Sequence, residues 1–196
     1  MKSRYRYGKS TPGRLLTLED PGRPLAFDAD RGLIEELSQR CDIKSFVGGL
    51  KEKGRKEREA DLRAFGERIM EATIELADGK YLDRAGEVIE KVAEQTGISF
   101  PHRLERYVEL SIIGSRPLDR WNITKATTKE FVLEVFGCSV LREMQEAGVE
   151  PDGGLCHALC LASFQAAARK TGDKVEMSVA KSLPQDGVCQ FSFVHT

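Results

Sequence analysis

The segment KVEMSVAKSLPQDGVCQFSFVH, residues 174–195, decides the fold of this chain. Apolar and polar residues alternate on both sides of its Pro-Gln-Asp-Gly segment, and an alternation of period two is typical of half-buried strands. An Asp-Gly pair between two such segments is a strong signal for a hairpin. Residues 173–195 are therefore predicted to form a terminal antiparallel hairpin. Its core face is predicted to carry Val175, Met177, Val179, Phe191 and Phe193.

Upstream of this hairpin, the same alternation predicts more strands, and apolar residues three and four apart predict two helices. Gly137-Cys138 marks a turn into the first helix. Asp152-Gly153-Gly154 opens the second helix, and Gly172 ends it. The predicted strands cover residues 107–112, 121–124 and 130–136. The predicted helices cover residues 140–147 and 155–170.

The first half of the chain is dominated by helical spacing, after an extended leader at residues 1–27. Helices, then strands, then helices and a final hairpin favour an α+β fold over a parallel, doubly wound sheet. We predict a helical layer packed on a small antiparallel sheet, with a C-terminal β-hairpin. A single α+β domain is expected over 28–196. Its helical half covers 28–104 and its sheet-containing half covers 105–196.

Composition places the chain among ordinary globular proteins and limits its partners. Hydrophobic residues make up 40% and charged residues 31%, with a formal net charge of −1. This balance gives no global electrostatic attraction to nucleic acid. No apolar run approaches the roughly 18 to 20 residues that span a bilayer. The basic amino terminus has no apolar core behind it, so it is not a secretory signal. We expect a cytoplasmic protein that binds neither nucleic acid nor membrane.

The chain has five cysteines, and without an export signal they are expected to be free thiols, metal ligands or a nucleophile. The most informative stretch is Cys156-His157-Ala158-Leu159-Cys160, because residues four apart share one face of a helix. Cys156 falls in the first helical turn, where the helix dipole would lower its pKa and favour the thiolate. Cys156 and His157 are therefore the candidate catalytic residues. Cys160 and Trp121 are the candidate ligand contacts.

A metal site is an alternative role for the thiols. Cys138, Cys156, Cys160 and Cys189 could supply the four ligands of a tetrahedral zinc site. Their spacing differs from the paired C-x2-C of zinc knuckles and ribbons, and from the tighter runs that bind iron–sulfur clusters. A third interpretation is that they are core residues, since free cysteine is among the most buried residue types. Zinc is the candidate cofactor, and the three roles stay open.

The last third of the chain resembles two related groups of proteins. One is the 4-vinyl reductase-type small-molecule-sensing domain, and the other is the L-2-amino-thiazoline-4-carboxylic acid hydrolase family. The resemblance implies a helical bundle over a small antiparallel sheet, with a buried ligand pocket between the helices and the sheet. The matching positions are Phe136-Gly137-Cys138-Ser139-Val140, Leu155-Cys156-His157 and Gly187-Val188-Cys189-Gln190-Phe191-Ser192-Phe193.

The resemblance also implies site chemistry. The sensor group would bind zinc through cysteines near the final hairpin, where Cys189 is the matching position. The partner cysteine would fall near Lys181-Ser182, where this sequence has none, so Cys138 or Cys156 would have to substitute. The hydrolase group would add water to a cyclic C=N bond, with His157 as the candidate base.

These observations favour a protein that binds a small organic ligand in a cysteine-lined site. If the protein is an enzyme, the resemblance implies a hydrolase acting on a small cyclic C–N substrate. Two alternatives belong to other classes: a non-catalytic protein-interaction module, which should expose an apolar patch, and a cysteine-ligated metal-binding protein. Whether two copies of the chain form a homodimer stays open.

Overall fold

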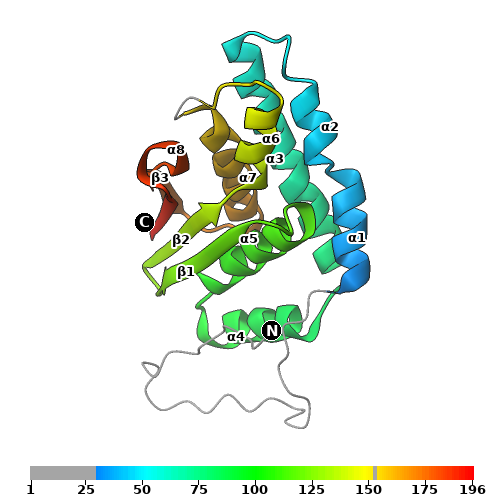
Figure 1. The fold of residues 1–196 in the computed structure, drawn as a ribbon. Coiled ribbons are helices and arrows are strands. Elements are labelled where there is room, and N and C mark those ends of the chain that lie inside the picture. The colour runs from blue at the N-terminus through cyan, green and yellow to red at the C-terminus, as the bar shows by residue number, and fades with distance from the viewer. Residues whose placement is uncertain (1–29, 152–153) are drawn as a thin grey trace.

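The computed structural model describes residues 30–151 and 154–196. The extended leader that we predict at 1–27 lies outside the described residues, as do Asp152 and Gly153 of the predicted helix start. Figure 1 shows the helices gathered behind and beside the strands, so that helices and sheet form separate layers.

Five helices precede the first strand in the described part of the chain. Asp30 and Asp42 cap the first two with side-chain oxygens that accept backbone N–H groups, and Asp83 caps the fourth in the same way. Gly97, in the left-handed region at φ 71°, ends the fourth helix. The helices are α1 (Arg31–Arg40), α2 (Ile43–Gly48), α3 (Arg55–Asp78), α4 (Arg84–Thr96) and α5 (His102–Ser115).

The sheet has four antiparallel strands in the order β1-β2-β4-β3. Two helices connect β2 to β3, and a one-turn helix connects β3 to β4. The predicted α+β class, with helices on a small antiparallel sheet, is confirmed. The strands are β1 (Arg120–Ala126), β2 (Glu130–Gly137), β3 (Val175–Lys181) and β4 (Cys189–His195). The connecting helices are α6 (Ser139–Glu146), α7 (Leu155–Thr171) and α8 (Leu183–Asp186).

The terminal hairpin pairs in the predicted way. Met177 lies opposite Phe193 and Val179 lies opposite Phe191, so these residues share one face of the sheet. Phe191 and Phe193 are 2% and 1% exposed. The ring of Phe164, on α7, meets both at nearly edge-to-face geometry, with centroid distances of 5.3 and 5.4 Å. The predicted hairpin and its core face are therefore confirmed.

One predicted strand is wrong, because residues 107–112 lie inside α5. Nearly every residue of α5 is buried, including the polar residues Glu105, Arg106, Glu109 and Ser111. In a helix that is covered on all sides, polar side chains no longer mark a solvent face. The alternation of apolar and polar residues in this segment therefore did not report a half-exposed strand.

The predicted turn Pro184-Gln185-Asp186-Gly187 between the last two strands is helical. Residues Leu183–Asp186 form the single turn α8, and Gly187 caps it at φ 73°. The carboxylate of Asp186 accepts the backbone N–H of Ser182 at 2.7 Å, which closes the turn. Here the Asp-Gly pair ends a short helix, which is another common use of a glycine with positive φ.

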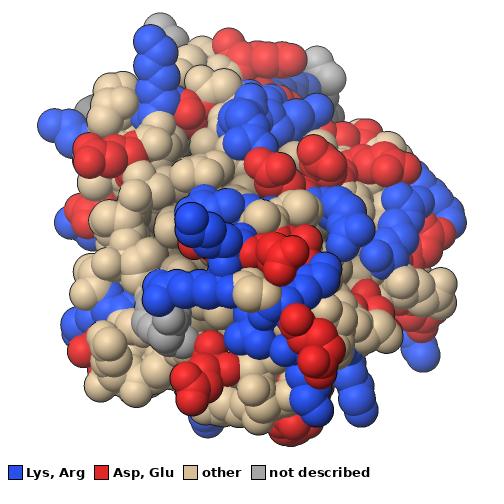
Figure 2. Space-filling view, turned by 90° about the horizontal axis from the view of Figure 1, so that it is seen from above, with Lys and Arg blue, Asp and Glu red and all other residues tan. Residues whose placement is uncertain are grey.

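The surface carries charges of both signs. Figure 2 shows Lys and Arg side chains interspersed with Asp and Glu over the face seen from above. Among the described residues, no helix is both long enough and apolar enough to cross a membrane.

Candidate functional site

Four of the five cysteines interact electrostatically in one buried region that also holds Arg116. Arg116 follows α5, is only 3% exposed, and donates a hydrogen bond from Nη1 to Sγ of Cys160 at 3.4 Å. Cys138, Cys156 and Cys189 lie near enough to interact electrostatically with Cys160, with one another or with the guanidinium. We call these four thiols and Arg116 the thiol cluster.

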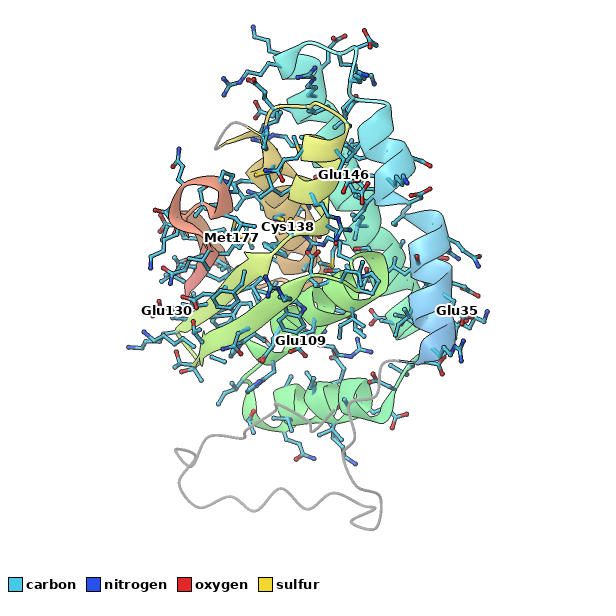
Figure 3. All side chains as sticks on the ribbon, viewed as in Figure 1. Glu35, Glu109, Glu130, Cys138, Glu146 and Met177 are labelled. Carbon is cyan, nitrogen blue, oxygen red and sulfur yellow. The ribbon has the colours of Figure 1, made fainter. Side chains whose placement is uncertain are left out.

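Three elements bring the thiols together. Cys156 and Cys160 lie one turn apart on α7, so the prediction that they share a helix is confirmed. Cys138 is the residue before α6, at the end of β2, and Figure 3 shows it between that strand and that helix. Cys189 begins β4. The sequence identified all four thiols but missed Arg116, because a lone arginine after a helix carries no signal that it is buried.

The thiols of the cluster are held in the neutral form. Burial, and then the neighbouring Cys160, raise the pKa of Cys138 to about 11, and the same two causes raise that of Cys156 to about 12. Burial also raises the pKa of Cys160, although Arg116 partly opposes this. The expectation that the helix start would lower the pKa of Cys156 is wrong, since desolvation outweighs the helix dipole.

A buried carboxylate accompanies the arginine. Oδ2 of Asp119 lies 3.7 Å from Nε of Arg116, and the two side chains are 1% and 3% exposed. Oδ1 of Asp119 accepts the backbone N–H of Ser139 at 2.6 Å and also the Ser139 hydroxyl, which ties the pair to the first turn of α6. Nε and Oδ2 themselves have no hydrogen-bond partner among the described residues. Two polar atoms that face one another are thus buried without a hydrogen bond, which is uncommon in folded proteins.

His157 points toward a different thiol from the one that the sequence suggested. Its Nε2 lies 3.7 Å from Sγ of Cys189, and its ring meets Phe191 edge-on at a centroid distance of 6.1 Å. The backbone N–H of Leu183 donates to the same sulfur at 3.2 Å. Burial lowers the pKa of His157 and raises that of Cys189, so both groups are held neutral. A neutral thiol with a neutral imidazole is not an activated nucleophile.

A surface cleft of about 470 Å³ opens beside the thiol cluster. The end of α1, the start of α2, the segment after α5 and the first turn of α6 line it. Arg116 and Ser139 are buried lining residues, whereas Leu118 stands at the rim and is 69% exposed. Arg116 therefore belongs both to the wall of the cleft and to the thiol cluster.

The remaining predicted contact and the fifth cysteine lie in different places. Trp121 is half-buried in β1, packs against the hydrophobic core, and is not among the residues that line the cleft. Cys41 does line the cleft, and it is buried at the end of α1. The four cysteines Cys138, Cys156, Cys160 and Cys189 interact electrostatically in the thiol cluster, and neither they nor Trp121 lines the cleft.

Across residues 30–151 and 154–196, no group of three or more His, Cys, Asp and Glu side chains is arranged to hold a metal ion. In this arrangement Cys160 receives a hydrogen bond from Arg116 instead. Metal binding by the four thiols would require them to rearrange.

Comparisons with known proteins give little support for any family. The chain matches no family model. No curated protein is significantly similar to it. One similar solved structure is an H-NOX domain from Shewanella oneidensis in the Fe(II)CO ligation state, determined by NMR. It shares 13% identity with this chain and has a TM-score of 0.42, over 84% of this chain and 86% of the other. A likeness at this level carries no conclusion about function.

The resemblance to the 4-vinyl reductase-type and thiazoline-carboxylate hydrolase groups is wrong: no model of either group matches the chain. The pocket that it implied between helices and sheet is also filled. Phe164 from α7 packs there on Phe191 and Phe193, and Phe131 from β2 lies 5.0 Å from Phe193. These four rings are at most 2% exposed.

Proposed function

We propose that this chain is a non-catalytic, small-molecule-binding domain, and that its ligand occupies the cleft at Arg116. The observation that carries this proposal is the open cleft itself, whose lining includes the buried Arg116. Behind that wall Arg116 pairs with Asp119, and Nε and Oδ2 face one another at 3.7 Å. The volume of about 470 Å³ suits a small organic molecule.

The chemistry of the cleft favours a ligand that combines an apolar part with a hydrogen-bond acceptor. Pro117 and Leu118 offer exposed apolar surface, and the exposed lining residues Ser38 and Gln39 offer hydrogen-bond donors. Lys44 and Arg142 balance Asp42 and Glu143 in the lining. This balance gives no reason to expect a highly charged ligand.

Catalysis is not part of the proposal. The two candidate catalytic residues, Cys156 and His157, are 7% and 8% exposed and do not line the cleft. Burial raises the pKa of that thiol to about 12, so little thiolate is present at neutral pH. Nothing in the geometry favours a hydrolase.

A haem-type cofactor does not fit these residues either. Haem iron needs an axial ligand in an enclosed pocket. The cleft is open to solvent and no histidine lines it, its Cys41 is buried with a pKa that burial raises, and His157 is packed between Phe191 and Cys189. We therefore assign no role to haem.

The proposal is tested by an amide NMR titration of the whole chain with two small probes, benzoate and benzamide. Saturable shifts of the Ser115, Leu118 and Ser139 amides are expected with at least one probe. Gln39→Trp should abolish them, because Gln39 is an exposed residue of the lining. Gln95→Trp, the same change at an exposed position on α4, should leave them intact. The proposal fails if neither probe shifts these amides, or if both variants behave alike.

Metal binding by the thiol cluster is the second candidate, because its four thiols interact electrostatically with one another. Their soft ligand set suits zinc, bound as thiolates after the thiols rearrange. Titration with Co²⁺ should then produce a sulfur-to-cobalt charge-transfer band that Cys138→Ser removes. Cys41→Ser is the matched control and should retain the band. Absence of the band in the unmodified chain would exclude this candidate.

A further inference from the structure

Strand β3 lies at one edge of the sheet, with β4 as its partner on the other side. Within the described residues no strand pairs with its outer edge, so a row of backbone N–H and C=O groups faces outward there. Figure 3 labels Met177 on this edge strand. The opposite edge strand is β1, and each of the two edge strands carries one bulge residue, Thr124 in β1 and Ala180 in β3.

A groove of about 390 Å³ lies between β3 and α7. Its walls are Val175 and Met177 from the inner face of β3, and Ala168 and Arg169 from the end of α7. An added strand beside β3 would lie over this groove. Every second side chain of that strand would point into it.

Two copies of β3 can pair through complementary side chains, once the extra residue near the end of the strand is taken into account. Val179 pairs with Phe191 and Lys181 with Gln190, so Lys181 takes the ladder position after Val179, and Ala180 is the extra residue of a bulge. In an antiparallel pair of two β3 strands centred on Ser178, Met177 would face Val179 of the second copy over the groove. Glu176 would face Lys181 on the outer side, where both are exposed.

We infer that two copies of this chain form a two-fold dimer by pairing β3 with β3 about Ser178. Each contact in this register is favourable or neutral. Apolar residues meet on the inner face, opposite charges meet on the outer face, and two small serines meet at the axis. A symmetric pairing of this kind uses the same surface on both copies, and it joins two four-stranded sheets into one continuous sheet.

The first test is the oligomeric state of the full chain by sedimentation velocity, from micromolar to millimolar concentration. A weak dimer is expected, since the contact is little more than one short strand per copy. Ser178→Lys should abolish it, because two like charges would then face each other at the axis. Ser178→Thr keeps a neutral side chain at the axis and should still dimerise. Ser38→Lys adds the same charge at an exposed site on α1 and should also dimerise.

A charge exchange gives a second, independent test. Glu176→Lys alone and Lys181→Glu alone should each weaken the dimer several-fold, because each places like charges opposite one another. The double variant E176K/K181E restores opposite charges and should recover most of the original dissociation constant. A chain that stays monomeric at millimolar concentration would overturn the inference. So would a dimer that neither Ser178→Lys nor the single charge reversals weaken.

Discussion

Nη1 of Arg116 lies 3.4 Å from Sγ of Cys160 and donates a hydrogen bond to it, which joins the segment after α5 to α7. The other side of the guanidinium faces Asp119 at 3.7 Å. A permanently charged group is thereby buried among neutral thiols with one carboxylate as its counter-ion. Because the carboxylate also holds the first turn of α6, this pair couples three elements around the cleft.

Removal of the arginine should therefore be costly. Arg116→Met leaves the carboxylate of Asp119 buried without its counter-ion, and we expect a loss of about 3 to 5 kcal/mol in the free energy of unfolding. Adding Asp119→Asn should recover part of this loss, since the neutral amide can still accept from Ser139. Urea denaturation of both single variants and of the double variant measures the coupling. Strictly additive effects would show that the two charges do not stabilise one another.

The thiol cluster should be unreactive in the folded protein. Burial raises the pKa of Cys156 to about 12 and of Cys138 to about 11. At pH 7.5 only a minute fraction of either is thiolate, so iodoacetamide should modify them slowly until urea unfolds the chain. Mass spectrometry of native and unfolded samples measures this. Rapid modification of Cys156 in the native protein would contradict the buried, neutral cluster.

The same shifts predict how stability depends on alkaline pH. The folded pKa of Cys156 lies above the unfolded value of about 9, so above pH 9 the unfolded chain loses this proton while the folded chain keeps it. The contribution of this thiol to the free energy of unfolding is fully present below pH 9, and it is lost as pH rises toward about 12. The free energy of unfolding should therefore fall over this range of pH, and that of Cys156→Ala should fall less steeply. The same slope for both proteins would contradict the raised pKa of Cys156.

The sequence predicted most elements of the fold, because patterning and turn residues act locally. Alternation on either side of Asp186-Gly187 was enough to place Phe191 and Phe193 on the core face. It failed at residues 107–112, because α5 is covered on all sides and its polar residues are buried too. A sequence pattern reports which face meets solvent, and a fully covered helix has no such face.

The site was predicted only in part, because burial is decided by distant parts of the chain. The spacing of Cys156 and Cys160 predicted that they share a helix, and this holds. The position of Cys156 at a helix start suggested a thiolate, but burial, and then the neighbouring Cys160, raises its pKa instead. Arg116 gave no signal in the sequence. Its partner Cys160 lies 44 positions further along the chain, and only folding brings the two side chains into contact.

The crossing of α3 and α7 depends on a single glycine. A Cβ at Gly66 would lie 2.1 Å from the carbonyl oxygen of Leu159, which is backbone and cannot turn aside. Gly66→Ala should therefore destabilise the protein by about 3 kcal/mol, although alanine is the better helix former. Gly48→Ala, at an open position in α2, should be neutral or slightly stabilising in the same urea denaturation experiment. Equal stability of the two variants would show that the helices can separate at little cost.

The buried histidine predicts a loss of stability in acid. Burial lowers the folded pKa of His157 below the unfolded value of about 6.5, so as pH falls the unfolded chain takes up a proton first. The contribution of this imidazole is therefore fully present above pH 6.5, and it is lost as pH falls through the folded pKa.

His157→Gln cannot titrate and keeps a polar side chain near Cys189. Its free energy of unfolding should be lower than that of the unmodified chain at pH 8, because the contacts of the ring with Phe191 and Cys189 are lost. The difference should narrow as pH falls toward 5. A constant difference between His157→Gln and the unmodified chain from pH 8 to pH 5 would show that His157 does not resist protonation in the folded state.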